Sequence, residues 1–210
     1  MVRWLTVAGG LAVAGLVVGL PSMQSVHQQR QFRNFRVVEP DKLYRSGQLP
    51  LAGLKRLIHE RGIRSVVSFR YADHPDALPP DHAEELFCRA ECIRYYRIKP
   101  REWSVAGDGA APAEECVRQF LQICDDPTNY PMLVHCFAGM HRTGAYCAIY
   151  RMEYSGWSNC EAMEEMRRLG YRNLDSEEDI STFLTNYVPR PWRGVRPSDR
   201  VPRSCDEDYR

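Results

Sequence analysis

Short β-branched segments alternate with helix-patterned segments between residues 43 and 188, and this alternation constrains the fold more than any other feature of the chain. The runs IRSVVSF at residues 63–69 and PMLVHC at residues 131–136 are short and apolar, as strands buried on both faces are. Strands that are connected through helices run parallel to one another when they share a sheet. The sequence therefore predicts an α/β fold with a central, largely parallel sheet flanked by helices.

Local signals set the boundaries of these elements. Gly62 indicates the end of a helix over residues 51–61, and Ser158 with Glu161 forms a capping box for a helix that ends at Gly170. The remaining elements are expected at these places: an extended piece at 43–45, a strand at 93–98, helices at 80–91, 112–124 and 142–154, and a last helix that Asp175 or Ser176 caps and that runs to about Val188.

The chain is long enough for one domain with appendages. We expect a domain at residues 40–188, preceded by an N-terminal hydrophobic segment at 1–23 and a linker at 24–39 that is rich in Gln and Arg. Residues 189–210 are rich in Pro and Arg and predict a disordered tail.

Residues 4–20 carry no charged side chain. As a helix they would span roughly 26 Å, slightly less than the ~30 Å hydrocarbon core of a bilayer. A cleaved secretory signal is the alternative, but no convincing small-x-small cleavage site follows, and arginines 30, 33 and 36 do. This pattern predicts an N-terminal hydrophobic helix that anchors the chain in a membrane by a single pass, with the domain on the cytoplasmic side; cleavage would instead make the protein secreted or periplasmic.

Charge and cysteine usage argue against a nucleic-acid-binding protein and against a metal-binding protein. The formal net charge is only +1, with basic ends and a mildly acidic middle, which argues against a nucleic-acid-binding partner. Most of the eight cysteines fall in apolar, helix-patterned stretches, where a free thiol behaves as a small hydrophobe. Because no second Cys or His pair accompanies Cys88 and Cys92 at zinc spacing, no metal site is expected.

The loop between the strand at 131–136 and the next helix carries the chemistry. Ala138 and Gly139 let successive backbone N–H groups turn inward as an anion-binding nest, and the helix N-terminus adds partial positive charge. Arg142 can offer two phosphate oxygens a planar fork. Cys136 lies at the base of this positive bowl, where the pKa of its thiol should fall. The arrangement suits phosphoryl transfer through a cysteinyl-phosphate intermediate.

The sequence HCFAGMHRTG resembles the Cys-x5-Arg signature of the protein tyrosine phosphatase superfamily. Its flanks, LYRSGQL at 43–49 and GIRSVVSFR at 62–70, are similar to those of the small dual-specificity phosphatases found in bacteria and elsewhere. The resemblance covers about residues 40–188. It implies a phosphate-binding loop between a strand and a helix, and neither a metal nor an organic cofactor.

Residue by residue, the resemblance implies Cys136 as the nucleophile and Arg142 as the phosphate clamp and transition-state stabiliser. Thr143 would assist departure of the thiolate during hydrolysis, and His135 would orient the loop and help to lower the thiol pKa. The backbone amides from Phe137 to Arg142 would hold the phosphate oxygens; these are the amides of Phe137, Ala138, Gly139, Met140, His141 and Arg142.

The position of the general acid is inferred from its separation in sequence from Cys136. The family supplies it from an Asp on a mobile loop roughly thirty residues before the cysteine. Asp108 lies at about that separation, between two glycines and just before a helix that starts at Pro112. Its competitors are Asp73, Asp76, Asp81 and Glu102.

The substrate class is indicated by what the loop lacks. Relatives that act on inositol phosphates tend to carry lysines in it, whereas this chain has Phe137 and Met140, with only His141 as a partial charge. This favours phosphotyrosine or mixed phosphoprotein substrates, or another small phosphomonoester. The alternatives are a phosphoinositide or inositol-phosphate phosphatase, a membrane-tethered phosphate-binding scaffold without turnover, and a redox enzyme that pairs Cys136 with a second cysteine.

Overall fold

A computed structural model of the chain describes residues 32–72, 74, 76–104 and 109–192. The hydrophobic segment predicted at 4–20, most of the predicted linker and the tail from residue 193 lie outside the described residues. Within the described ranges, no helix has the length and apolar character needed to cross a membrane.

The centre of the fold is a five-stranded sheet with the order β1-β2-β5-β3-β4. Its strands are β1 (Arg36–Glu39), β2 (Leu43–Gly47), β3 (Ser65–Ser68), β4 (Arg94–Arg97) and β5 (Met132–Cys136). Only β1 runs antiparallel to its neighbour, and the other pairings are parallel. The predicted largely parallel sheet is therefore confirmed, with β5 at its centre.

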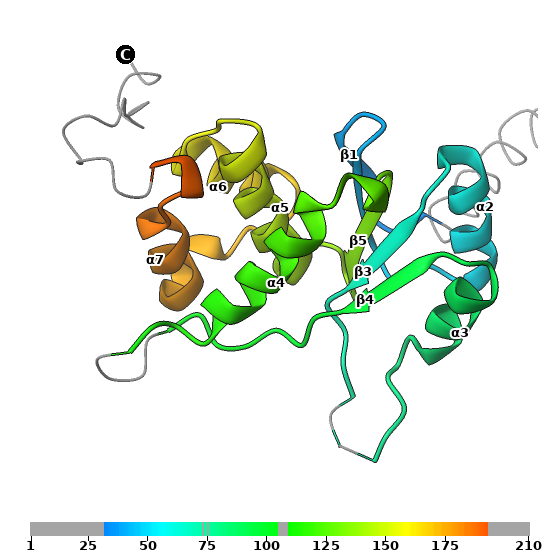
Figure 1. Cartoon of the computed structure of the whole chain (residues 1–210). Coiled ribbons are helices and arrows are strands. Elements are labelled where there is room, and N and C mark those ends of the chain that lie inside the picture. The colour runs from blue at the N-terminus through cyan, green and yellow to red at the C-terminus, as the bar shows by residue number, and fades with distance from the viewer. Residues whose placement is uncertain (1–31, 73, 75, 105–108, 193–210) are drawn as a thin grey trace, which may run out of the picture.

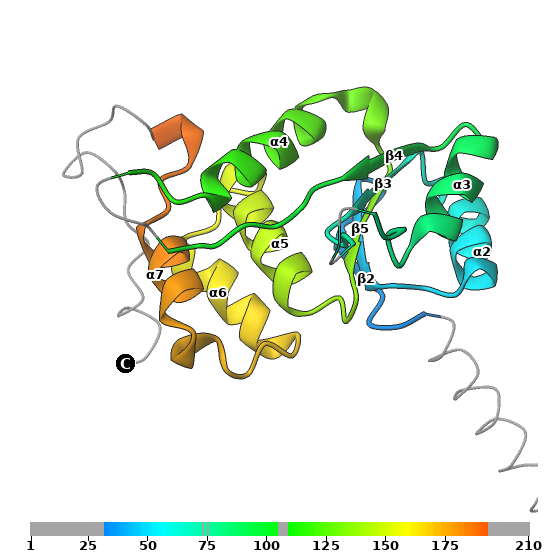
Figure 2. The ribbon, with the colours of Figure 1, turned by 90° about the horizontal axis from the view of Figure 1, so that it is seen from below.

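Helices cover both faces of the sheet, as the two ribbon views show (Figures 1 and 2). One face carries α2 (Leu51–Arg61) and α3 (His82–Ala90). The other side carries four helices: α4 (Ala113–Asp125), α5 (His141–Tyr154), α6 (Asn159–Arg168) and α7 (Glu178–Asn186). Three short 3₁₀ turns complete the described elements, at Pro127–Asn129, Leu174–Ser176 and Arg190–Trp192.

The strands are apolar throughout because their alternating side chains enter two different cores. Val66 and Leu133 pack with α2 and α3, whereas Val67 and Val134 pack on the side of α4 to α7. All four side chains are at most 1% exposed. The predicted double burial of these two runs follows from this three-layer arrangement.

The helix signals of the sequence are largely confirmed. Gly62 ends α2 in the left-handed conformation at φ 61°, and its N–H is bonded to the carbonyl of Ile58. The Ser158–Glu161 capping box at the start of α6 is present in both directions. The expectation that Asp175 or Ser176 caps the last helix is wrong, because both residues belong to a 3₁₀ turn and α7 begins at Glu178 without a side-chain cap.

Two domain boundaries also need correction. Residues 36–39 of the predicted linker form β1, which extends the sheet beside β2. At the other end, packed structure continues past Val188, because Pro189 is buried and Arg190 contacts the domain. Arg190 Nε lies 2.9 Å from the Glu153 carboxylate, whose side chain is only 1% exposed, and Arg190 Nη1 lies 2.6 Å from Asp125. The charge of Arg190 thus compensates a buried carboxylate.

We expect Arg190→Ala to lower the free energy of unfolding by about 2–3 kcal/mol, because the buried Glu153 carboxylate would lose its cation. Chemical denaturation followed by circular dichroism measures this change. The control is Arg167→Ala, which removes an exposed ion pair to Asp175 and should have little effect. Equal stability of the two variants would contradict a structural role for Arg190.

Candidate active site

The segment that joins β5 to α5 lies at the carboxyl end of the central strand, where ligands bind in open parallel sheets. β2 runs alongside, with Gly47 in register with Cys136. The backbone of β2 and the segment just before β1 therefore lie directly against this catalytic loop, which we define as residues 136–142.

Three successive carbonyl groups of the catalytic loop accept hydrogen bonds from residues outside the loop. The carbonyl of Phe137 accepts from the backbone N–H of Gln48 at 3.1 Å. The carbonyls of Ala138 and Gly139 accept from the side chains of Asn34 and Arg45, each at 2.8 Å. Because these carbonyls face β2 and the preceding segment, the amide N–H groups of the loop are turned toward its interior, as an anion-binding nest requires.

Gly139 is needed for this close approach. Its φ is +75°, and a Cβ there would lie 2.3 Å from the backbone nitrogen of Gly47. Any side chain would thus push the loop away from β2. The sequence-based interpretation of Gly139 as part of a nest is consistent with this geometry.

The Cys136 thiol lies beneath the loop and is 4% exposed. Burial alone would raise its pKa, but the hydroxyl and amide of Thr143, the N–H of Gly139 and the charge of His135 together hold the pKa below its ordinary value. The Gly139 N–H donates to Sγ at 3.2 Å. The site therefore favours a thiolate, which is the nucleophilic form of cysteine.

His135 is paired with a carboxylate that the sequence did not single out. Its Nε2 lies 2.7 Å from Oε1 of Glu84 on α3, and the two side chains are 2% and 7% exposed. The contact is an ion pair between two buried side chains. Burial disfavours the imidazolium, but the charge of Glu84 outweighs burial and raises the pKa of His135. A cation is thus kept next to the thiol.

Arg142 lies in the first turn of α5, at the rim of the bowl. Its Nη1 is 3.4 Å from the carbonyl of Phe69, and its guanidinium carbon lies 5.5 Å from the ring centre of Tyr71. It remains exposed, with no ion pair in the described part of the chain. Its fork is available to an oxyanion above Cys136.

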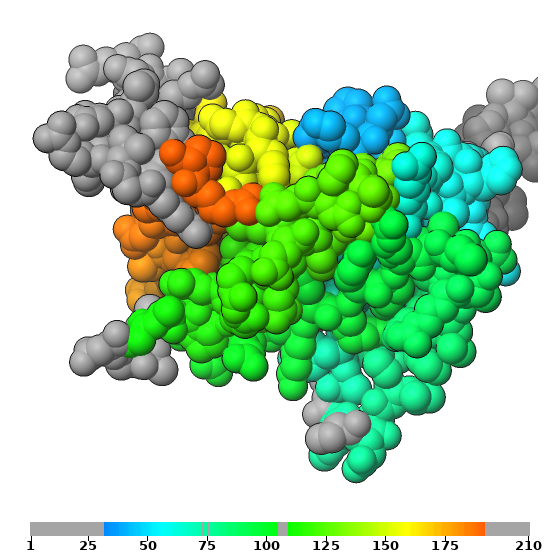
Figure 3. All heavy atoms as spheres, viewed as in Figure 1, coloured from blue at the N-terminus to red at the C-terminus, as the bar shows by residue number. Residues whose placement is uncertain are grey.

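A cavity of about 570 Å³ adjoins Arg142. One wall is the connection from β3 to α3, which projects from the body of the molecule (Figures 1 and 3). The cavity is lined by Arg70, Tyr71, Ala72, His74, Ala77, Leu78, Pro80, Phe137 and Arg142. Of the predicted loop residues, Phe137 and Arg142 thus line a partly aromatic pocket.

The side chains of His141 and Met140, two further residues of the predicted loop, pack against residues outside the loop. The ring of His141 stacks on Tyr171 at 4.4 Å between centres, and Met140 packs against Gly170. Both side chains therefore point toward the connection between α6 and α7.

The structure excludes one of the candidates for the general acid. Asp81 is 2% exposed and accepts from Ser68, Tyr95 and Arg97; burial raises its pKa, but these three donors outweigh burial and lower it. It is a fixed structural anion, so we exclude it as the acid. Asp108 and Asp73 lie outside the described residues, whereas Asp76 and Glu102 are exposed.

Sequence reasoning missed Glu84 and the donors to the loop, Arg45 and Asn34. Glu84 had a detectable signal, since it shares a helix face with the buried Cys88. The contacts of Asn34 and Arg45 with a loop about a hundred residues away had none that a single sequence contains.

The remaining cysteines and carboxylates suggest no further centre. Besides Cys136, five described cysteines are free thiols, and four of them are buried, which fits the packing role predicted for most of the cysteines. Burial, together with the charges of Glu84 and Glu85, raises the pKa of Cys88 to about 12. No group of His, Cys, Asp and Glu in the described ranges has the arrangement of a metal site.

We expect Glu84→Gln to raise the pKa of the Cys136 thiol by about one unit or more, because the buried His135 would lose its counter-charge and become neutral at lower pH. Alkylation of Cys136 by iodoacetamide, followed by mass spectrometry across pH, reports this pKa. The inflection should move to higher pH in Glu84→Gln but not in the neighbouring Glu85→Gln. An unchanged inflection in Glu84→Gln would contradict the role of this ion pair.

Comparison with known proteins places the chain in a family. A family profile described as "DSP-PTPase phosphatase fused to NAD+ Kinase" matches residues 17–182. The tyrosine-protein phosphatase-like protein OCA2 of Saccharomyces cerevisiae is 30% identical over 160 residues, which cover 73% of this chain and 75% of OCA2. The dual specificity protein phosphatase TpbA of Pseudomonas aeruginosa (strain UCBPP-PA14) is 41% identical over 54 residues, about a quarter of either chain.

Solved structures share the fold. The crystal structure of P. aeruginosa TpbA has a TM-score of 0.56 at 25% identity, covering 74% of this chain and 85% of that one. The core catalytic domain of the PP-IP phosphatase SIW14 from S. cerevisiae has a TM-score of 0.57 at 22% identity, with coverages of 74% and 86%. The chain therefore belongs to this DSP-PTPase family and is a small phosphatase of the dual-specificity type within the protein tyrosine phosphatase superfamily.

Proposed function

We propose that the chain is a cysteine-dependent phosphomonoester hydrolase that acts on phosphotyrosine or mixed phosphoprotein substrates through a cysteinyl-phosphate intermediate. The observation that carries the proposal is the thiol of lowered pKa beneath a loop whose carbonyls are held outward. A pure phosphate-binding scaffold would have no use for a reactive thiolate at this place.

In the first step, Sγ of Cys136 attacks the phosphorus atom and the bond from phosphorus to the ester oxygen breaks. The leaving oxygen takes a proton from the general acid, which we assign to Asp108. The inward N–H groups of the loop and the fork of Arg142 stabilise the charge on the non-bridging oxygens.

In the second step, a water molecule attacks the phosphocysteine and gives its proton to the same carboxylate. The sulfur–phosphorus bond breaks, inorganic phosphate leaves, and the thiolate is restored. Thr143 faces the sulfur and stabilises the departing thiolate, while His135 and Glu84 supply positive charge behind it. The cycle needs no external reductant or cofactor.

The walls of the cavity support an aromatic phosphate ester. Tyr71 and Phe137 contribute aromatic rings to the lining, and Leu78 is an exposed apolar side chain in the same lining. A phosphotyrosyl ring between such walls would bury apolar surface while its phosphate reaches the loop. An inositol phosphate is the alternative, and its support comes from the fold shared with SIW14, which is described as a PP-IP phosphatase.

The proposal predicts that Cys136→Ser abolishes hydrolysis of p-nitrophenyl phosphate and of a phosphotyrosyl peptide, with a loss of several orders of magnitude in kcat. Acid quenching of the wild-type reaction should also trap phosphate on the Cys136 peptide. The control is Cys92→Ser, which changes an exposed cysteine and should retain full activity. Turnover by Cys136→Ser at the wild-type rate would exclude the covalent mechanism.

For the general acid, we expect Asp108→Asn to lower kcat on a phosphotyrosyl peptide by about 10²–10⁴-fold and to remove the basic limb of the pH–rate profile. The loss should be smaller for p-nitrophenyl phosphate, whose leaving group needs less protonation. Asp76→Asn and Glu102→Gln serve as matched controls. If one of these two variants, and not Asp108→Asn, loses the basic limb, the assignment belongs to that residue.

A further inference from the structure

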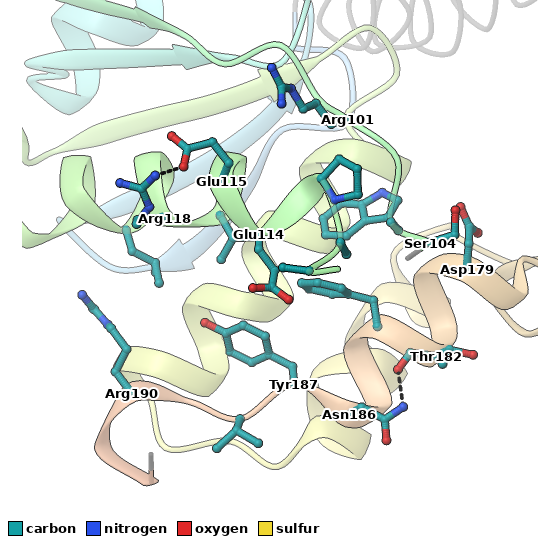
Figure 4. A pocket seen from close by; sticks show the side chains of 18 of the residues that line it. Arg101, Ser104, Glu114, Glu115, Arg118, Asp179, Thr182, Asn186, Tyr187 and Arg190 are labelled. Atoms are coloured by element: carbon teal, nitrogen blue, oxygen red, sulfur yellow. Dashed lines mark hydrogen bonds and ion pairs between the residues drawn. The ribbon is translucent and has the colours of Figure 1, made fainter. Parts of the chain in front are cut away.

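A groove of about 1410 Å³ lies between α4 and α7, apart from the catalytic loop (Figure 4). Its lining includes three aromatic side chains. The rings of Trp103 and Phe183 meet edge to face, with 4.9 Å between their centres, and the ring of Tyr187 lies 6.0 Å from that of Phe183. Trp103 and Phe183 are only half-buried, so the groove presents aromatic surface that the domain itself leaves uncovered.

The rim of this groove carries more unpaired negative than positive charge. Three exposed carboxylates in the lining form no ion pair in the described part of the chain: those of Glu114, Glu178 and Asp179. Of the arginines in the lining, Arg118 and Arg190 are already held by carboxylates, so among the described residues only Arg101 lacks such a partner. The groove therefore favours an occupant that brings cations to an aromatic surface.

The chain itself supplies a segment of this kind beside the groove. Arg190 lines the groove and is fixed there by its ion pairs, and the described part of the chain ends two residues later, at residue 192. The sequence that follows, RGVRPSDRVPR at 193–203, holds four arginines and one aspartate, a net charge of +3. This charge is opposite in sign to the unpaired charge of the rim.

The length and the prolines of residues 193–203 also suit the groove. Pro197 and Pro202 favour the extended polyproline II conformation, and proline-rich segments in this conformation bind in aromatic-lined grooves. At ~3.1 Å per residue such a segment reaches roughly 34 Å, whereas the 13 residues of α4 span about 20 Å. Because the segment is tethered beside the groove, its effective concentration is high and weak contacts suffice.

We propose that residues 193–203 bind in the groove between α4 and α7 of the same chain, with their arginines against the acidic rim and their prolines against Trp103 and Phe183. The proposal gives the basic tail a role that the phosphatase reaction does not supply. It is independent of that reaction, because the groove and the catalytic loop share no residue.

The test is tryptic cleavage of the full chain after Arg200 and Arg203, measured by mass spectrometry as an initial rate. Two variants of the groove leave the tail unchanged. Glu178→Gln/Asp179→Asn removes charge from the rim, and Thr182→Arg places a cation on an exposed lining position of α7. Both variants should raise the cleavage rate about fivefold or more, because trypsin cuts the tail only while it is released.

The control is Asp41→Asn/Glu91→Gln, which removes two exposed carboxylates outside the groove and should keep the wild-type cleavage rate. Thermal unfolding at the wild-type temperature shows that each variant is folded.

Three results would overturn the proposal. The first is a wild-type cleavage rate in both groove variants. The second is an equal increase in the control, because the effect would then follow the net charge of the domain. The third is protection that grows when the protein concentration is raised tenfold, which would assign the groove to the tail of a second copy of the chain.

Discussion

The active site depends on the way neighbouring backbone and side chains hold the carbonyl groups of the catalytic loop. An N–H group of the loop can face an anion only if the carbonyl of the same peptide group faces away from it. Here Gln48, Asn34 and Arg45 donate hydrogen bonds to these carbonyls and hold them outward. These donors come from β2 and from the segment before β1, so the fold must bring residues 34–48 beside residues 136–142. The parallel pairing of β2 with β5 does this, and Gly139 permits the close approach.

A second constraint lies behind the loop. A thiol as buried as Cys136 would ordinarily resist ionisation, and the imidazolium of His135 would resist burial. Glu84 on α3 keeps His135 charged, and His135 adds to the hydrogen bonds from Thr143 and Gly139 that favour the thiolate. The two faces of the sheet thus have different tasks: α5 presents the anion-binding end of a helix, and α3 on the other face supplies the counter-charge.

Local charge, rather than net charge, is what would attract phosphate to this site. The domain is mildly acidic, yet Arg70 and Arg142 line the cavity, next to the rings of Phe137 and Tyr71. A separate groove of about 1410 Å³ lies between α4 and α7 and contains no residue of the catalytic loop (Figure 4). Its rim carries both signs of charge, for example Glu114, Arg118 and Asp179, so its size alone does not make it the phosphate site.

Much of the fold followed from local signals, because the buried strands, Gly62 and the Ser158 capping box act through neighbours in sequence. The strand–loop–helix around Cys136 was found for the same reason. What sequence reasoning missed depends on distant pairing: β1 forms only against β2, Arg190 is ordered by Glu153, and Glu84 acquires its role only when α3 packs behind His135.

The most direct test of the account is a crystal structure with bound tungstate, a phosphate mimic. We predict an oxyanion directly above Sγ of Cys136, accepting hydrogen bonds from the amides of the catalytic loop and from both arms of Arg142. An anion bound elsewhere, or a loop whose carbonyls point at the bowl, would contradict it.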